Sequence, residues 1–204
     1  MIVIGNIDGL KKGVVYLQRV QDSTVVSVDS LEIRGDGSFV FEEEIESPEI
    51  FYLYLEKADN NDINDRITFF GEKGTITINT TWNQFESEAK IAGSKNHELF
   101  EEYREMLSNF NKRDFELAQI ALTAGDSINT DSIEQLAEHN YLSRFRYLLN
   151  FGLTNPTSHV APYMAVTDGT EANPIYLDSI YNKLPDSIAN GKYGKALKAF
   201  IDKN

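Results

Sequence analysis

Ser127 carries a hydroxyl group and lies in a short motif suited to nucleophilic catalysis, Gly125-Asp126-Ser127-Ile128. A serine of this kind needs a strand-to-helix turn and a histidine base, commonly supplied by a downstream Asp-x-x-His. Ser127 instead falls between two predicted helices, and no aspartate stands three residues before a histidine. A loop connecting two helices is therefore the better interpretation, and ester hydrolysis is the weaker one.

Oxygen and nitrogen ligands for a metal ion are present, but their spacing is unfavourable. The oxygen-rich segment fails the calcium-loop pattern because Ile63 and Arg66 occupy ligand positions and no bidentate glutamate follows. The histidines are far apart in the sequence and are interpreted as surface or hydrogen-bonded structural residues. The residues concerned are Asp59, Asn60, Asn61, Asp62, Asn64 and Asp65, and His97, His139 and His159.

The sequence has no cysteine. Thiolate catalysis, disulfides and thiolate metal sites are therefore excluded within these residues. Carboxylates cluster in two places, but nothing marks a pair as acid and base, so solvated faces are expected. We predict no catalytic residue, no metal site and no cofactor. The two carboxylate clusters are Glu42-Glu43-Glu44 and Glu101, Glu102 and Glu105.

Two further features suggest binding. Arg34-Gly35-Asp36 resembles an adhesion tripeptide, although a tight Gly-Asp-Gly turn explains it fully. Several strand aromatics could form a sugar-stacking platform, although such rings more often pack a core. Trp82 and Phe85 are the residues selected as a possible ligand platform. The full aromatic set is Phe51, Tyr52, Tyr54, Phe69, Phe70, Trp82 and Phe85.

Short alternating runs and turn signals fill the first ninety or so residues. Residues 50–55 are apolar on both faces, which predicts a central strand. Gly35-Asp36-Gly37 and Gly74 predict hairpins between the runs that flank them. The predicted strands cover about residues 2–7, 14–20, 25–28, 31–33, 39–41, 50–55, 67–70, 76–78 and 89–91.

The apolar period changes from 2 to 3.6 residues at Gly93. A first helix over about 99–110 would be capped by Ser94 or Asn96, and a second covers about 133–149. Asp131 with Glu134 resembles a capping box, and Gly152 with Pro156 marks the end of the second helix. Three shorter helices are expected near 160–166, from Pro174 onward and over 193–201.

These patterns predict an α+β fold. We expect an antiparallel, jelly-roll-like β-sandwich over residues 1–92 and a helical region over 94–204 packed against it. The net charge of -13 disfavours nucleic-acid binding. No apolar run reaches the ~20 residues that a membrane-spanning helix needs.

Turn and strand motifs are spread over residues 4–10, 13–17, 28–30, 37–41, 47–49, 69–70, 74–78, 91–94, 155–158 and 191–197. These motifs resemble those of a protein family found in Gram-negative bacteria. That family is a domain of unknown function that precedes a thioredoxin-fold module of the thiol:disulfide interchange (alkyl hydroperoxide reductase-like) kind. The resemblance covers nearly all of the sequence, and none of its motifs is a catalytic signature.

The resemblance implies a non-catalytic accessory or protein-interaction domain. It also implies an exported protein, periplasmic or anchored to the outer membrane, whose precursor carries a leader. The expected partner is another protein or a covalently linked thioredoxin-like module. A glycan- or peptide-binding protein of the cell envelope is the alternative, and a hydrolase built on unidentified carboxylates is a weaker third.

The absence of cysteine gives a direct chemical prediction. Disulfide reduction by thiol exchange requires a thiolate nucleophile and a mixed-disulfide intermediate. The purified chain should therefore reduce insulin at the background rate, and an added Cys-x-x-Cys protein should serve as the positive control. Reduction above background by the pure chain would contradict this prediction.

Overall fold

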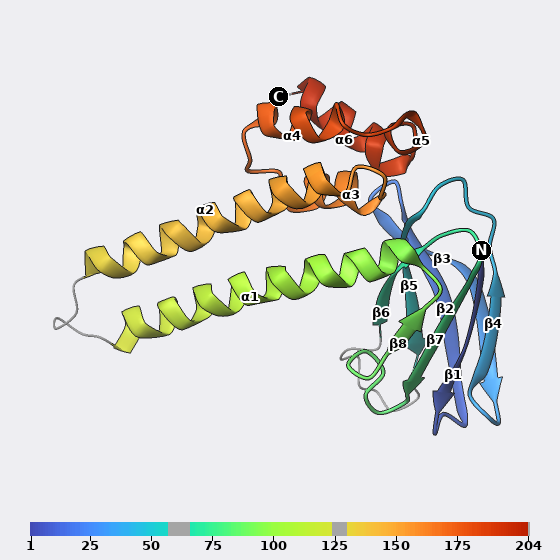
Figure 1. Cartoon of the computed structure of the whole chain (residues 1–204). Coiled ribbons are helices and arrows are strands. Elements are labelled where there is room, and N and C mark those ends of the chain that lie inside the picture. Colours follow the sequence, from blue (N-terminus) through green and yellow to red (C-terminus); the bar gives the residue numbers. More distant parts are fainter. Residues whose placement is uncertain (57–65, 124–129, 204) are drawn as a thin grey trace. The chain divides into compact units, whose positions relative to one another are not determined.

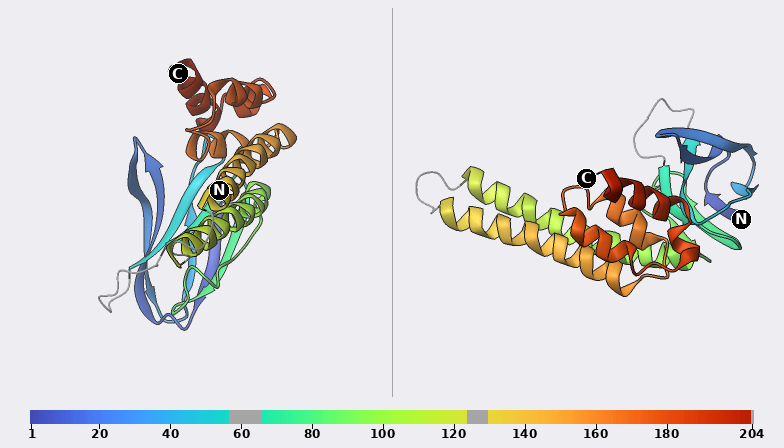
Figure 2. Two further views of the ribbon diagram at one scale, coloured as in Figure 1. Left: turned by 90° about the vertical axis from the view of Figure 1, so that its left-hand side faces the viewer. Right: turned by 90° about the horizontal axis from the view of Figure 1, so that it is seen from above.

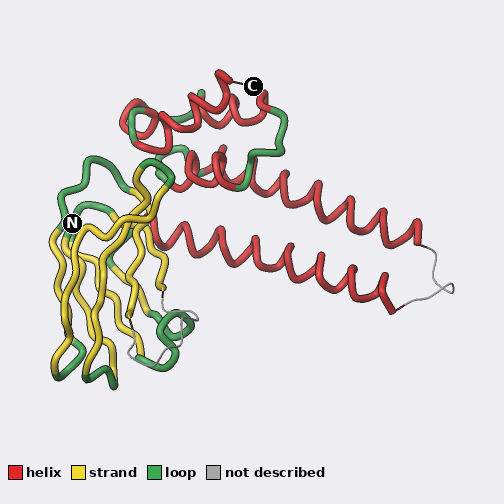
Figure 3. Tube along the Cα trace, turned by 180° about the vertical axis from the view of Figure 1, so that it is seen from behind, coloured by secondary structure: helices red, strands yellow, loops and turns green. Residues whose placement is uncertain are grey.

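Contacts within the chain divide it into two units, Met1–Glu98 and Leu99–Asn204. The computed structural model describes residues 1–56, 66–123 and 130–203. Its described strands all lie in the first unit, and helices fill the second (Figures 1 and 3). The expected α+β class, with strands first and helices second, is confirmed.

The strands form two four-stranded sheets, one in the order β4-β1-β7-β8 and the other in the order β3-β2-β5-β6. Figure 2 shows the strands from two further sides. Alternate side chains of both sheets point inward and share one buried apolar cluster. The strands are β1 (Ile2–Asp8), β2 (Lys12–Gln21), β3 (Thr24–Arg34), β4 (Ser38–Glu42), β5 (Glu49–Glu56), β6 (Arg66–Gly71), β7 (Thr75–Thr81) and β8 (Lys90–Ala92).

One strand pair departs from the expected antiparallel arrangement. β1 pairs with β7 in parallel, with Ile2 opposite Thr75, whereas the other described pairings are antiparallel. Strand β5 lies between β2 and β6, so the prediction of a central strand at residues 50–55 is correct. The two runs predicted at 25–28 and 31–33 form one strand, β3.

The two predicted hairpins at residues 35–37 and around Gly74 are wrong. β3 and β4 belong to different sheets, as do β6 and β7, so both turns carry the chain across the sandwich. Gly37 has φ +78°, and a Cβ there would lie 2.2 Å from the Ile7 carbonyl oxygen. The turn therefore depends on glycine for a close crossing, not for a hairpin.

The second unit is built on two long helices, α1 (Lys95–Thr123) and α2 (Thr130–Thr154), which run antiparallel (Figures 1 and 3). Ser94 caps α1 as predicted, since its Oγ accepts the His97 N–H at 3.0 Å. The Glu72 carboxylate accepts the Lys95 N–H at 2.6 Å and so binds the first turn to the sandwich.

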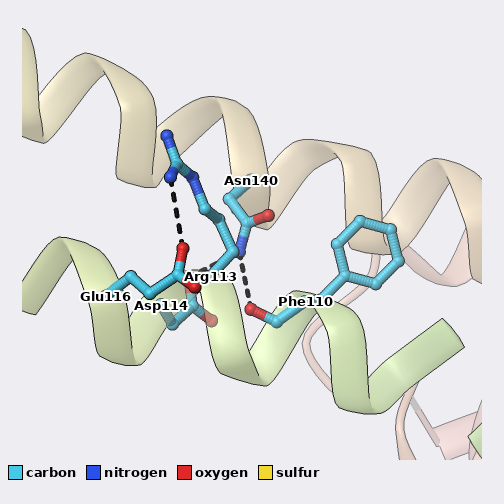
Figure 4. A network of polar contacts seen from close by, with 5 residues as sticks. All are labelled: Phe110, Arg113, Asp114, Glu116 and Asn140. Carbon is cyan, nitrogen blue, oxygen red and sulfur yellow. Dashed lines mark hydrogen bonds and ion pairs between the residues drawn. The ribbon is translucent and has the colours of Figure 1, made fainter. Parts of the chain in front are cut away.

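Contacts between α1 and α2 follow positions spaced alternately by three and four residues, the spacing of a coiled coil. Rings of both helices meet along this seam, for example Tyr103 and Phe151 at 5.2 Å. Figure 4 shows its polar segment, where Asn140 Nδ2 donates to the Phe110 carbonyl at 3.0 Å and to Asp114 Oδ1 at 2.6 Å. The contacts join Tyr103, Phe110 and Asp114 on α1 to Asn140, Tyr147 and Phe151 on α2. The same spacing extends the seam to Leu107 and Leu117 on α1, and to Ile133, Ala137 and Arg144 on α2.

Four shorter described helices complete the unit, and α3, α4 and α6 lie close to one another. Gly152 does not end α2 as predicted, because the helix continues to Thr154. A Cβ at Gly152 would lie 2.7 Å from Ile180 Cδ1 and 2.9 Å from Met164 Cε, so this glycine permits close packing against α3 and α4. The shorter helices are α3 (Val160–Thr167), α4 (Pro174–Tyr181), α5 (Asp186–Ala189) and α6 (Lys192–Lys203).

The sandwich core gives a stability prediction. Phe51 is fully buried and stacks on Phe69 at 6.0 Å, whereas Tyr52 points to the outer face and is half-buried. Phe51→Ala should lower the free energy of unfolding by about 3–5 kcal/mol because a cavity opens in the core. Tyr52→Ala should lower the free energy of unfolding by about 1 kcal/mol or less. Urea denaturation measures both, and equal losses would contradict the assigned orientation of β5.

Candidate functional site

The outer face of the β3-β2-β5-β6 sheet carries three tyrosines and an arginine on neighbouring strands. The register places Tyr16 of β2 beside Tyr54 of β5, and Tyr54 beside Arg66 of β6. Tyr52 lies two residues along β5, opposite Gln18. These side chains face outward because Val15, Leu17, Phe51, Leu53 and Leu55, which alternate with them, are fully buried in the core.

Contacts hold these rings in a defined arrangement. The Tyr16 and Tyr54 ring centroids lie 5.9 Å apart, with 32° between their planes. The Arg66 guanidinium carbon lies 5.3 Å from the Tyr52 ring centroid and 5.6 Å from that of Tyr54, within cation–π range. We call this surface the tyrosine face: Tyr16, Tyr52, Tyr54, Arg66, Gln18 and Glu56.

Polar groups border the rings. The Tyr16 hydroxyl donates to Glu56 Oε2 at 2.6 Å, and Gln18 Nε2 donates to Ser27 Oγ at 3.2 Å. The hydrogen bond to the Glu56 carboxylate, with smaller contributions from burial and from the negative charge of Glu56, raises the pKa of Tyr16. The tyrosines are half-buried, whereas Arg66 and Glu56 are exposed. The face therefore offers flat apolar rings, a cation and a carboxylate to a ligand, and from Gln18 only the Nε2 donor, because Gln18 Oε1 is buried.

The aromatic set selected from the sequence divides between core and surface. Phe51, Phe69 and Phe70 are fully buried, and only Tyr52 and Tyr54 of that set belong to the tyrosine face. The predicted platform of Trp82 and Phe85 does not form. Phe85 is 2 % exposed and belongs to the core, so its ring has no surface for a ligand. Trp82 is 44 % exposed, and its ring packs against Gly9. A Cβ added at Gly9 would lie 2.6 Å from Trp82 Cδ1.

The other sequence candidates do not come together as a site. The oxygen-rich segment up to Asp65 and the Gly125-Asp126-Ser127-Ile128 block lie outside the described residues. Of the histidines, His139 is exposed. His97 is buried and its Nδ1 accepts the Phe70 N–H at 3.4 Å, whereas the buried His159 ring packs against Gly191.

No described group of three histidine, aspartate or glutamate side chains could hold a metal ion. A hollow beside β7 and β8, lined by residues such as Asn79, Ser87 and Lys90, contains no aromatic ring. No described helix is both long enough and apolar enough to span a membrane. The tyrosine face therefore offers more varied groups for recognition than the hollow beside β7 and β8 does.

Tyr16, Arg66 and Glu56 were missed by the sequence reasoning. Each lies on a different segment, and only the strand register brings them together. The available signal was the alternation in 51–55, where phenol rings at Tyr52 and Tyr54 interrupt apolar residues. Tyrosine hydroxyls need water or a hydrogen-bond partner, which places them on the outer face.

Comparison with known families covers the sandwich. Residues 1–100 match the model of a family described as a domain of unknown function (DUF4369). No curated protein and no solved structure matches the chain significantly. The tyrosine face lies wholly within the matched residues.

The raised pKa of Tyr16 can be measured. The bond to Glu56 needs a protonated phenol, so it contributes to stability below the ordinary tyrosine pKa of 10.0 and is lost as the pH rises through the raised value. The difference between ultraviolet titrations of the wild type and Tyr16→Phe should show one phenol ionising above pH 10. Glu56→Gln should shift this ionisation to lower pH. A Tyr16 transition at or below pH 10 would contradict the bond.

Proposed function

We propose that this protein is a non-catalytic interaction domain and that it binds its partner through the tyrosine face. The observation that carries the proposal is the ordered set of Tyr16, Tyr52, Tyr54 and Arg66 on one accessible sheet face. Tyrosine and arginine are enriched among residues that dominate protein–protein binding energy. Their rings already have fixed neighbours, so little conformational entropy is lost on binding.

A protein or peptide partner is the leading ligand class. Tyrosine combines a large apolar ring with a hydroxyl and has few rotatable bonds, which suits it to peptide recognition. Arg66 and Glu56 provide opposite charges at the border of the rings and can select the orientation of a partner. The absence of cysteine and the dispersed histidines further support a role without catalysis.

A glycan of the cell envelope is the second candidate. The accessible rings of Tyr16 and Tyr54 could stack on sugar faces, while Gln18, Glu56 and Arg66 could bond to hydroxyl groups. A sugar ligand would depend on hydrogen bonds as much as on the rings. Removal of the Gln18 amide therefore separates this candidate from an apolar peptide.

We also propose, on the sequence resemblance alone, an exported protein that works beside a thioredoxin-fold module in the periplasm or at the outer membrane. The natural gene tests this proposal. A leader in the precursor, together with a Cys-x-x-Cys module in the same reading frame or an adjacent gene, would support it. A cytosolic protein with neither feature would refute it.

Binding at the tyrosine face can be tested with a random peptide display library and a panel of envelope oligosaccharides. Tyr54→Ala combined with Arg66→Ala should lower the affinity for any selected ligand by about 30-fold or more, as expected for residues at the centre of an interface. The matched control is Val40→Ala, on β4 of the other sheet, which is 58 % exposed. Thermal melting confirms that both variants are folded.

The two ligand classes give different outcomes. If the selected peptides lose affinity in the double variant and no sugar binds, the tyrosine face is assigned to a protein partner. Sugars that also lose affinity in Gln18→Ala would assign it to a glycan. Ligands that are unaffected by the double variant, or equally affected by Val40→Ala, would refute the tyrosine face as the binding surface.

A further inference from the structure

The hairpin of α1 and α2 has two sides, and only one of them is packed against α3 and α4. Gly152 identifies that side, because its Cα approaches Ile180 and Met164. On α2, Phe145 lies one heptad before Gly152, and Tyr141 lies one heptad before the buried Leu148. Phe145 and Tyr141 therefore continue the same side toward the far end of the hairpin, beyond α3 and α4.

Large apolar side chains occupy this side without being buried. On α1, Phe115 and Leu122 are seven residues apart and point outward from the seam, on the side that matches Tyr141 in an antiparallel pair. Phe115 is 64 % exposed, Leu122 86 % and Tyr141 46 %. Exposed apolar residues grouped in this way are typical of an interaction surface.

The start of α4 extends the same surface. The Tyr141 hydroxyl donates to Glu171 Oε2 at 3.2 Å, two residues before Asn173, which caps α4 by accepting the Ile175 N–H at 3.1 Å. Ile175 is 66 % exposed and Tyr176 53 %. Figure 1 shows α4 above the C-terminal half of α2. We call the combined surface the apolar step: Phe115, Leu122, Tyr141, Phe145, Ile175 and Tyr176.

Most of the charged groups around the apolar step are acidic. Glu134 and Glu138 are exposed on the same side of α2, and Glu171 contacts Tyr141. Arg113 and Arg146 lie on the opposite side of the hairpin. Arg144 is the basic exception near the step, since its Nη1 donates to Asn111 Oδ1 at 3.3 Å and its charge partly offsets the rise that burial and Glu171 cause in the pKa of Tyr141. The step is therefore an apolar surface whose border is mainly acidic.

We propose that the apolar step binds a basic amphipathic helix of a partner protein. Apolar residues of such a helix at positions i, i+3 or i+4, and i+7 would cover Phe115, Leu122 and Tyr141. Lysine or arginine residues beside that stripe would pair with Glu134, Glu138 and Glu171. A second copy with a net charge of -13 would bring like charges together, and an anionic membrane would be repelled in the same way.

The probe is a fluorescent Leu/Lys peptide of about 18 residues, about five helical turns, with leucine on one face. Fluorescence anisotropy should show saturable binding to the full chain, and a Leu/Glu peptide of the same pattern should not bind. Phe115→Ser with Leu122→Ser should weaken binding at least tenfold. The matched control is Leu136→Ser, which is 48 % exposed on the opposite side of the hairpin and should leave affinity unchanged.

Charge requires its own control because the whole chain is acidic. Glu134→Gln with Glu138→Gln should weaken binding and reduce its salt dependence, whereas Glu42→Gln with Glu44→Gln changes the net charge equally and should have no effect. Equal losses of affinity in the two double variants would show nonspecific electrostatic attraction and overturn the proposal. So would a dimer in sedimentation that Leu122→Ser dissociates, because a second copy would then occupy the step.

Discussion

Burial of one apolar cluster between two stacked sheets constrains the rest of the sandwich. Phe39, Phe51, Phe69 and their neighbours fill this space, and each strand must direct alternate side chains into it. The residues between them are then forced outward whatever their chemistry. Tyr16, Tyr52 and Tyr54 meet on one face because Val15, Leu17, Phe51 and Leu53 must meet on the other.

The same constraint explains which parts of the fold the sequence could predict. Two-residue alternation and the change of period at Gly93 are local signals, and they located the strands, the Ser94 cap and the α+β order correctly. The partner of a strand is not a local property. A glycine turn such as 35–37 has the same composition whether the next strand joins its own sheet or crosses to the other. The parallel pairing of β1 with β7 joins segments about seventy residues apart and left no local signal.

Prediction of the candidate site failed for the same physical reason. Aromatic residues were recognised as a group, but a ring in a strand is equally compatible with either face until the register is known. Phe85 entered the core, whereas Tyr52 and Tyr54 joined Tyr16 and Arg66 from other strands. Gly152 shows the corresponding limit in helices, since a glycine that permits close packing resembles one that ends a helix.

The composition of the helical seam explains why the far half of the hairpin has surface left for a partner. Near α3 and α4, Tyr103, Tyr147 and Phe151 supply large rings that bury much apolar area. Farther along, the seam changes to Asn140 bonded to Asp114, and the next seam position toward the start of α2 is the small residue Ala137. A polar pair in a seam fixes the register of the helices at a cost in stability. Phe115 and Leu122 point outward along this weaker half, so a helix that covered them would add apolar burial where the hairpin itself provides least.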